Sequence, residues 1–121
     1  MRKPVHFLGD AEDVLAALPK AVKLSLGFGL YVAQCGEKAA NAKPLKGFGG
    51  AGVLEVLEDD RGGTYRAVYT VKFKGVVFVL HVFQKKSKKG IETPQEEMAL
   101  VKRRLLEAQK IWERDYRHGQ A

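Results

Sequence analysis

At 121 residues, with 45% hydrophobic and 29% charged side chains, the chain suits one folded domain with a modest core and is not a disordered protein. A net charge of +7 and a pI near 9.6 favour an anionic partner, with nucleic acid ahead of an acidic protein. The single cysteine excludes an internal disulfide and a multi-cysteine metal site, and the lack of a signal-peptide pattern or an apolar run of transmembrane length predicts a cytoplasmic protein.

The first third of the chain predicts one strand and two helices. Residues 5–8 form a candidate strand, and Asp10 is a candidate N-cap for a helix that stops or bends at Pro19. A second helix is expected from Pro19 to about Cys35, which we interpret as a buried or idle thiol. We expect two glycines of this helix, Gly27 and Gly29, to pack closely against the hairpin predicted below, and its core-facing stripe to contain Leu24, Phe28 and Tyr31.

Residues 37–52 predict a loop that carries basic side chains. Its segment GFGGAG at 47–52 matches the GxGxxG pattern of dinucleotide-binding loops. Such a site needs a strand before the glycines and a helix after them, whereas here a strand follows at residues 53–58. We therefore interpret the segment as a flexible loop, in which Lys43 and Lys46 are candidate phosphate contacts.

The second half predicts a hairpin and a long helix. After a DDRGG turn, residues 64–85 indicate two strands joined by a tight turn at Lys74–Gly75. Residues 93–96, TPQE, predict a capping box that begins a helix ending near Arg117. Its apolar stripe is expected either to cover the sheet or, at its distal end, to dock a partner; the stripe consists of Met98, Val101, Leu105, Ala108 and Trp112.

Pairing Phe73 with Val76 across the turn assigns each hairpin side chain to a face. The apolar face, expected to meet the core, contains Tyr65, Ala67, Tyr69, Val71 and Phe73 opposite Gln84, Val82, Leu80, Phe78 and Val76. The other face places Arg66 opposite Phe83, with His81 and Lys85 on either side, and we expect solvent and RNA to reach it. Residues 43–90 contain ten Lys/Arg and four Asp/Glu, so a net of +6 out of +7 lies on or beside this hairpin.

The predicted order is β-α-α-β-β-β-α, an α+β fold over residues 1–121: a small, mostly antiparallel four-stranded sheet with a helical hairpin on one face and a C-terminal helix. Order and residues together resemble the RelE/HigB-like toxins of type II toxin–antitoxin systems, particularly their phage-derived branch. The resemblance covers about residues 5–108. It rests on KPLKG at 43–47, YRAVY at 65–69, HVFQKKS at 81–87 and the Thr93-Pro94 helix start.

The resemblance implies an endoribonuclease that cleaves mRNA in the ribosomal A site without a metal or cofactor, inhibits translation, and is neutralised by an antitoxin, often a helix-turn-helix protein. The ribose 2′-OH attacks the neighbouring phosphate in line. Carried over residue by residue, Arg66 is the strand arginine, and Lys85, with Lys86 beside it, is the basic residue ending the last strand. The tyrosine or histidine that many relatives place after that strand is missing, which leaves the general base unassigned.

We therefore predict a catalytic set and an RNA-binding set. The catalytic set is Arg66, Lys85, His81 and Lys86, and the RNA-binding set is Lys43, Lys46, Phe83, Lys88 and Lys89. The alternatives are an ion pair of Arg66 with Glu58 or Asp59, a hydrogen-bonded core role for His81, and burial of Phe83 under the last helix. For the whole chain, the alternative is a non-catalytic basic module that binds RNA or a protein partner on the same scaffold.

Overall fold

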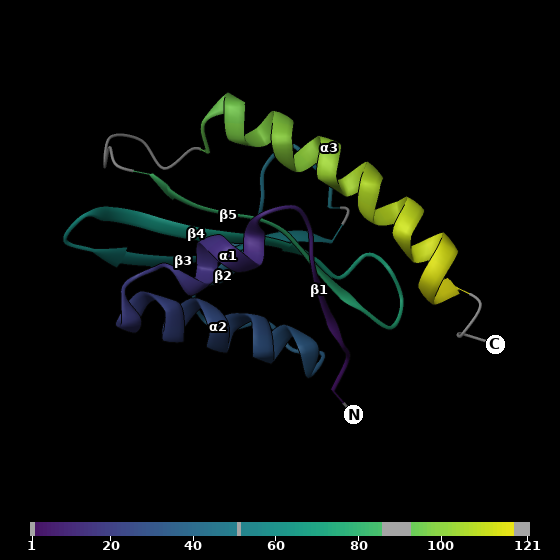
Figure 1. The fold of residues 1–121 in the computed structure, drawn as a ribbon, viewed down its shortest axis with the longest axis horizontal. Helices are drawn as coiled ribbons and strands as arrows, with labels where there is room; N and C mark the ends of the chain where they lie inside the picture. The colour runs from purple at the N-terminus through teal and green to yellow at the C-terminus, as the bar shows by residue number, and fades with distance from the viewer. Residues whose placement is uncertain (1, 51, 86–92, 118–121) are drawn as a thin grey trace.

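The computed structural model describes residues 2–50, 52–85 and 93–117, in which five strands form one sheet in the order β1-β5-β4-β3-β2 (Figure 1). The strands are β1 (Val5–Phe7), β2 (Ala42–Pro44), β3 (Val53–Asp60), β4 (Gly63–Thr70) and β5 (Val77–Lys85). β1 is parallel to β5, and all other neighbours are antiparallel. The predicted α+β class is confirmed, but the sheet has one more strand than expected, because β2 lies within the predicted loop and pairs with β3.

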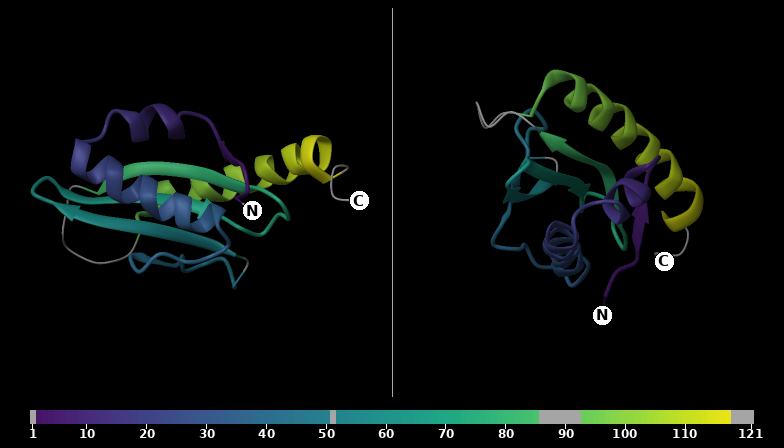
Figure 2. Two further views of the ribbon diagram at one scale, coloured as in Figure 1. Left: turned by 90° about the horizontal axis from the view of Figure 1, so that it is seen from below. Right: turned by 60° about the vertical axis from the view of Figure 1, so that its left-hand side comes forward.

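Helices cover both faces of this sheet (Figures 1 and 2). α1 (Ala11–Ala16) and α2 (Lys20–Gln34) lie on one face, and α3 (Gln95–Ile111) crosses the other and continues into a π-helical turn, η1 (Trp112–Tyr116). The cluster beneath α1 and α2 includes Val22, Leu26, Leu30, Ala67, Tyr69 and Val82. The cluster beneath α3 includes Val53, Val68, Phe83, Val101 and Ala108. Within the described ranges, every helix is too short or too polar to cross a membrane.

The hairpin of β4 and β5 has the expected register only over its first half. The pairs from Thr64 to Val68 are as predicted, but Tyr69 then pairs with Val79, so Leu80 is an extra residue in β5. This β-bulge reverses the alternation of the remaining side chains of β5. The residues assigned to the wrong face are Phe78 and Leu80, which lie on the α3 side of the sheet, and Val77 and Val79, which lie on the side of α1 and α2.

The predicted turn at Lys74–Gly75 is present, but it does not join the paired strands directly, because residues 71–76 all lie between β4 and β5. Phe73 in this connection is buried, with its ring centroid 5.7 Å from that of Phe78 and 5.8 Å from that of Trp112. The indole Nε1 of Trp112 also donates to the carbonyl oxygen of Lys74 at 2.9 Å. The distal end of the predicted apolar stripe, around Trp112, therefore packs on the protein's own core. This outcome agrees with the prediction that the stripe covers the sheet rather than docking a partner.

α2 presents a different face to the sheet from the one predicted. Its buried residues are Val22, Leu26, Gly29, Leu30 and Ala33. The expected core residues Leu24, Phe28 and Tyr31 are instead 61%, 63% and 44% exposed. Both sides of the helix are apolar, so periodicity cannot choose between them. Gly29 decides which side of α2 faces the sheet. A Cβ at this position would lie 2.7 Å from Cγ1 of Val56, so α2 can approach β3 this closely only on the side where glycine has no side chain.

The helix ends use their polar residues differently from the prediction. Asp10 and Thr93 make no capping hydrogen bond from their side chains. Asp10 Oδ1 accepts instead from Arg104 Nη2 at 3.0 Å, and Thr93 Oγ1 accepts from an arginine of β4. Pro94 occupies the N-cap position of α3, so the predicted capping box is absent. Cys35, just after α2, is exposed rather than buried.

The two glycines of α2 predict opposite effects on stability. Gly29→Ala is expected to lower the free energy of unfolding by about 1–3 kcal/mol, because the new methyl group overlaps Val56. Gly27→Ala is expected to raise it by up to about 1 kcal/mol, since a Cβ there meets no atom within 4 Å and alanine favours the helix. Urea denaturation of both variants measures the difference, and stabilisation by both would contradict the close packing at Gly29.

Candidate active site

The centre of the candidate site is a buried ion pair between two adjacent strands. Glu55 on β3 is paired with Val68 of β4, so Arg66, two residues before Val68, is its diagonal neighbour on the α3 side of the sheet. Arg66 Nη1 donates to Glu55 Oε1 at 3.0 Å, and the two side chains are 3% and 4% exposed. Arg66 is therefore covered rather than open to solvent, and its partner is Glu55 rather than Glu58 or Asp59.

Basic side chains surround Glu55. Lys43 of β2 lies directly opposite it in the β2–β3 ladder. Burial raises the pKa of Glu55 above its usual value, and this effect is opposed by the charges of Arg66, Lys43 and Lys85 and by the hydrogen bond from Arg66. A carboxyl group with a raised pKa exchanges its proton closer to neutral pH, as a general acid or base requires.

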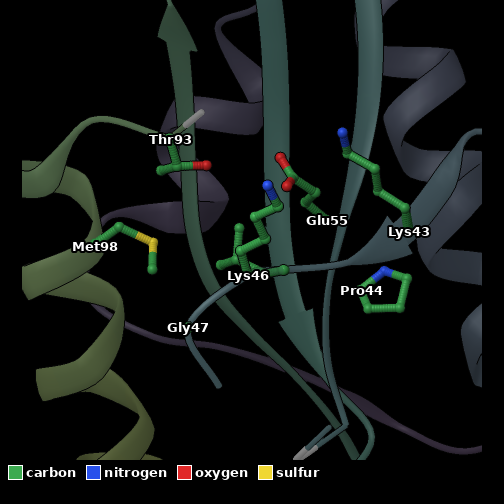
Figure 3. A pocket seen from close by; sticks show the side chains of 8 residues that line it. Lys43, Pro44, Lys46, Gly47, Glu55, Thr93 and Met98 are labelled. Atoms are coloured by element: carbon green, nitrogen blue, oxygen red, sulfur yellow. The ribbon is translucent and has the colours of Figure 1, made fainter. Parts of the chain in front are cut away.

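A cavity of about 370 Å³ opens beside Glu55 (Figure 3). Its lining consists of Lys43, Pro44, Leu45, Lys46, Gly47, Glu55, Thr93 and Met98. β2 and the loop after it form one wall, and the beginning of α3 contributes Met98 to the other. Figure 3 shows the amino groups of Lys43 and Lys46 directed toward the side of the cavity where the Glu55 carboxylate lies. Two ammonium groups beside one carboxylate suit a phosphodiester with an adjacent hydroxyl group.

His81 and Phe83 lie on the same face as Arg66, as predicted, but they are only 7% and 8% exposed. Their rings are stacked, with centroids 4.9 Å apart and planes 19° apart. His81 Nε2 is 2.7 Å from Glu97 Oε2, and Nδ1 is 3.4 Å from Arg104 Nη1. These contacts fit a hydrogen-bonded core histidine and a buried phenylalanine, which were the alternatives to catalysis and base stacking.

The predicted lysines fall into two groups. Lys43 and Lys46 are exposed at the cavity, and Lys85 is half-buried at the end of β5. The remaining three, Lys86, Lys88 and Lys89, lie outside the described residues. The structure thus brings Arg66, Lys43, Lys46 and Lys85 around one carboxylate.

Glu55 is the residue that the sequence analysis missed. The signal was present in the DDRGG turn, because a two-residue loop at Arg61-Gly62 pairs Asp60 with Gly63. That register pairs Glu55 with Val68, which places Glu55 on the same face of the sheet as Arg66 and diagonally across from it. The position of Lys43 opposite Glu55 was not predictable from a turn, because β2 was not recognised as a strand.

Comparisons with known proteins identify the family. Residues 13–106, more than half of the chain, match the model of the family described as Phage derived protein Gp49-like (DUF891). The chain belongs to the Gp49-like family. A comparison of this Gp49-like chain with curated proteins found no match.

Two solved structures are similar to this Gp49-like protein. A mutant of the E. coli toxin RelE in the free state shares 25% sequence identity with a TM-score of 0.52, covering 85% of this chain and 98% of that chain. The toxin–antitoxin complex RelBE2 from Mycobacterium tuberculosis shares 22% identity with a TM-score of 0.47, covering 72% of this chain and 95% of that chain. The family match and the RelE similarity confirm the predicted RelE-like fold and its phage-derived branch.

Proposed function

We propose that this Gp49-like protein is the toxin of a type II toxin–antitoxin pair, a metal-free endoribonuclease that cleaves mRNA on the ribosome and so inhibits translation. The family and the RelE-like fold support this proposal. The observation that carries it is Glu55, a buried carboxyl group with a raised pKa in the lining of a basic cavity. Glu55 supplies the general base that the resemblance to RelE/HigB-like toxins left unassigned.

In the proposed reaction, the Glu55 carboxylate takes the proton of the ribose 2′-OH, and the 2′-oxygen attacks the neighbouring phosphorus. Lys43 and Lys46 hold the phosphate oxygens and offset the negative charge that develops on them. The bond from phosphorus to the 5′-oxygen breaks, and Lys85 donates a proton to that oxygen. The products are a 2′,3′-cyclic phosphate and a free 5′-OH.

Arg66 has a positioning role in this proposal, because its side chain is covered and bonded to Glu55. Its hydrogen bonds to Glu55 and Thr93 hold the carboxylate at the cavity. The stacked His81 and Phe83 support the same wall through Glu97 of α3. Lys86, Lys88 and Lys89 contact the RNA backbone without sequence preference, as lysine–phosphate contacts generally do.

Expression without the antitoxin, proposed to be a helix-turn-helix protein, is expected to arrest growth and to produce new 5′ ends at codon-related positions of translated mRNA. The double variant Lys43→Ala/Lys46→Ala is expected to lower cleavage by about 10²–10³-fold, as the loss of charge-stabilising groups does elsewhere. Primer extension on translated message measures this. Lys102→Ala/Lys110→Ala, on the exposed side of α3, is the control because it removes the same charge and is expected to cleave like the parent. Equal cleavage by both double variants would place the reaction elsewhere.

A second candidate function is a non-catalytic basic module that binds RNA or a protein partner. The ion pair of Arg66 with Glu55 and the short contact of His81 with Glu97 favour it, since these two members of the predicted catalytic set are engaged within the protein. The same primer-extension experiment separates the two functions. Unbroken message that is nevertheless bound by the protein supports the module, and cleaved message supports the enzyme.

A further inference from the structure

The outward face of α2 carries an apolar stripe made of Leu24, Phe28 and Tyr31, here called the α2 stripe. These side chains are 61%, 63% and 44% exposed. Their spacing of four and three residues aligns them on one side of the helix, and the ring centroids of Phe28 and Tyr31 are 6.3 Å apart. Adjacent large apolar side chains in water typically mark a surface that another molecule covers.

The rest of the helix gives no reason for this exposure. The opposite side of α2 already packs on the sheet through its buried residues, including Leu26 and Leu30. The stripe is therefore additional to the core, and α2 is apolar on two sides. Full burial of such side chains contributes roughly 1.5–3 kcal/mol each, which a partner gains by covering them.

Positive charge lies at both ends of the α2 stripe. Lys20 is four residues before Leu24 on the same side of the helix, and it is exposed. At the other end, the guanidinium of Arg2 lies over the ring of Tyr31, 5.7 Å from its centroid. α2 itself contains no aspartate or glutamate. The surface is thus three apolar side chains in a row between two cations.

We propose that the α2 stripe docks an amphipathic helix of a second, acidic protein. The apolar side chains of this helix contact the stripe, and carboxylates at its two ends meet Lys20 and Arg2. The residues from 20 to 31 span about 16 Å of helix, which matches about three turns of a partner helix. The chemistry of this partner follows from the stripe alone. Its identity as the antitoxin rests on the proposed function.

Charge complementarity argues against a second copy of this chain as the occupant. Because both ends of the stripe are cationic, two copies brought together in either orientation would place Lys20 and Arg2 against like charges. Each copy also carries a net charge of +7. Like charges brought together at an interface disfavour association, whereas an acidic helix meets opposite charge at both ends.

The test measures binding of a synthetic helical peptide of about 18 residues, with leucines at three- and four-residue spacing and glutamates at both ends. Fluorescence anisotropy of the labelled peptide gives the Kd. We expect Phe28→Ser to weaken binding by about tenfold or more. Lys20→Glu is expected to weaken binding severalfold, and this effect is expected to be smaller at high salt. The matched control is Leu106→Ser, because Leu106 on α3 is 65% exposed, like Phe28 at 63%, and its loss is expected to leave the Kd unchanged.

Expression in cells separates this inference from the proposed function. Without antitoxin, Phe28→Ser is expected to be as toxic as the parent, and with antitoxin it is expected to escape neutralisation. A non-toxic parent would overturn the proposed function and leave the peptide result standing. Unchanged peptide binding by Phe28→Ser, a dimer in sedimentation that this variant dissociates, or stripe-dependent binding only to phosphatidylglycerol vesicles would each overturn the docking proposal.

Discussion

Replacement of Glu55 by glutamine is expected to lower mRNA cleavage by about 10²–10⁴-fold, because an amide cannot accept the proton of the 2′-OH. The amide oxygen can still accept the hydrogen bond from Arg66 Nη1, so the site keeps much of its shape. Cleavage is measured by primer extension. RNA binding is measured by the amount of unbroken message that the protein retains. The free energy of unfolding is measured on the same sample to separate lost chemistry from lost structure.

The pH dependence of cleavage provides a second measurement on Glu55. Since the base acts in its deprotonated form, the rate falls as the pH is lowered through the pKa of Glu55, which burial raises above 4.5. This acid limb is expected to disappear in Glu55→Gln. The linked effect on stability has the opposite sense: a raised pKa favours folding most below the unfolded pKa, and this contribution is lost as pH rises through the folded pKa.

The control for this series is Glu58→Gln. Glu58 belongs to the same strand, but its carboxylate accepts a hydrogen bond from Ser25 of α2 on the other side of the sheet. Its replacement is expected to leave both the rate and the acid limb unchanged. Full cleavage by Glu55→Gln with the acid limb intact would exclude Glu55 as the base.

Arg66→Ala is expected to lower the free energy of unfolding by about 3–5 kcal/mol, because it leaves the buried Glu55 carboxylate without its charged partner. The double variant Glu55→Leu/Arg66→Met replaces both charges by apolar groups of similar size. We expect it to be nearly as stable as the parent or more stable, although it cannot cleave mRNA.

A double-mutant cycle measured by urea denaturation quantifies the interaction of Arg66 with Glu55. Arg66→Ala, Glu55→Leu and Arg66→Ala/Glu55→Leu, together with the parent, complete this cycle. A strongly favourable coupling is expected, since the two side chains are 3% and 4% exposed. Additive effects of the two single changes would show that the pair does not contribute to stability through its mutual interaction.

The candidate site was only partly predictable from the hairpin. Strand pairing correctly placed Arg66, His81 and Phe83 on one face, because the predicted cross-strand register holds over residues 64–68 of β4 and 81–85 of β5. Burial of His81 and Phe83 was one of two interpretations, and the burial of all three side chains depends on α3 lying across that face (Figure 2). Glu55 and Lys43 come from two other strands and meet only when β2 joins the sheet.

By itself, the sequence determined the α+β class, the positions of most helices and strands, the basic hairpin and the RelE-like family, because these depend on local propensity, turns and short motifs. Tertiary structure alone decided the bulge at Leu80, the side of α2 that faces the sheet, and the burial of the Glu55–Arg66 pair beneath α3. In the first two cases, local patterns allowed two arrangements with similar apolar periodicity. Packing selected one: Gly29 admits Val56 at close range, Phe73 fills the space between Phe78 and Trp112, and Arg66 offsets the cost of burying Glu55.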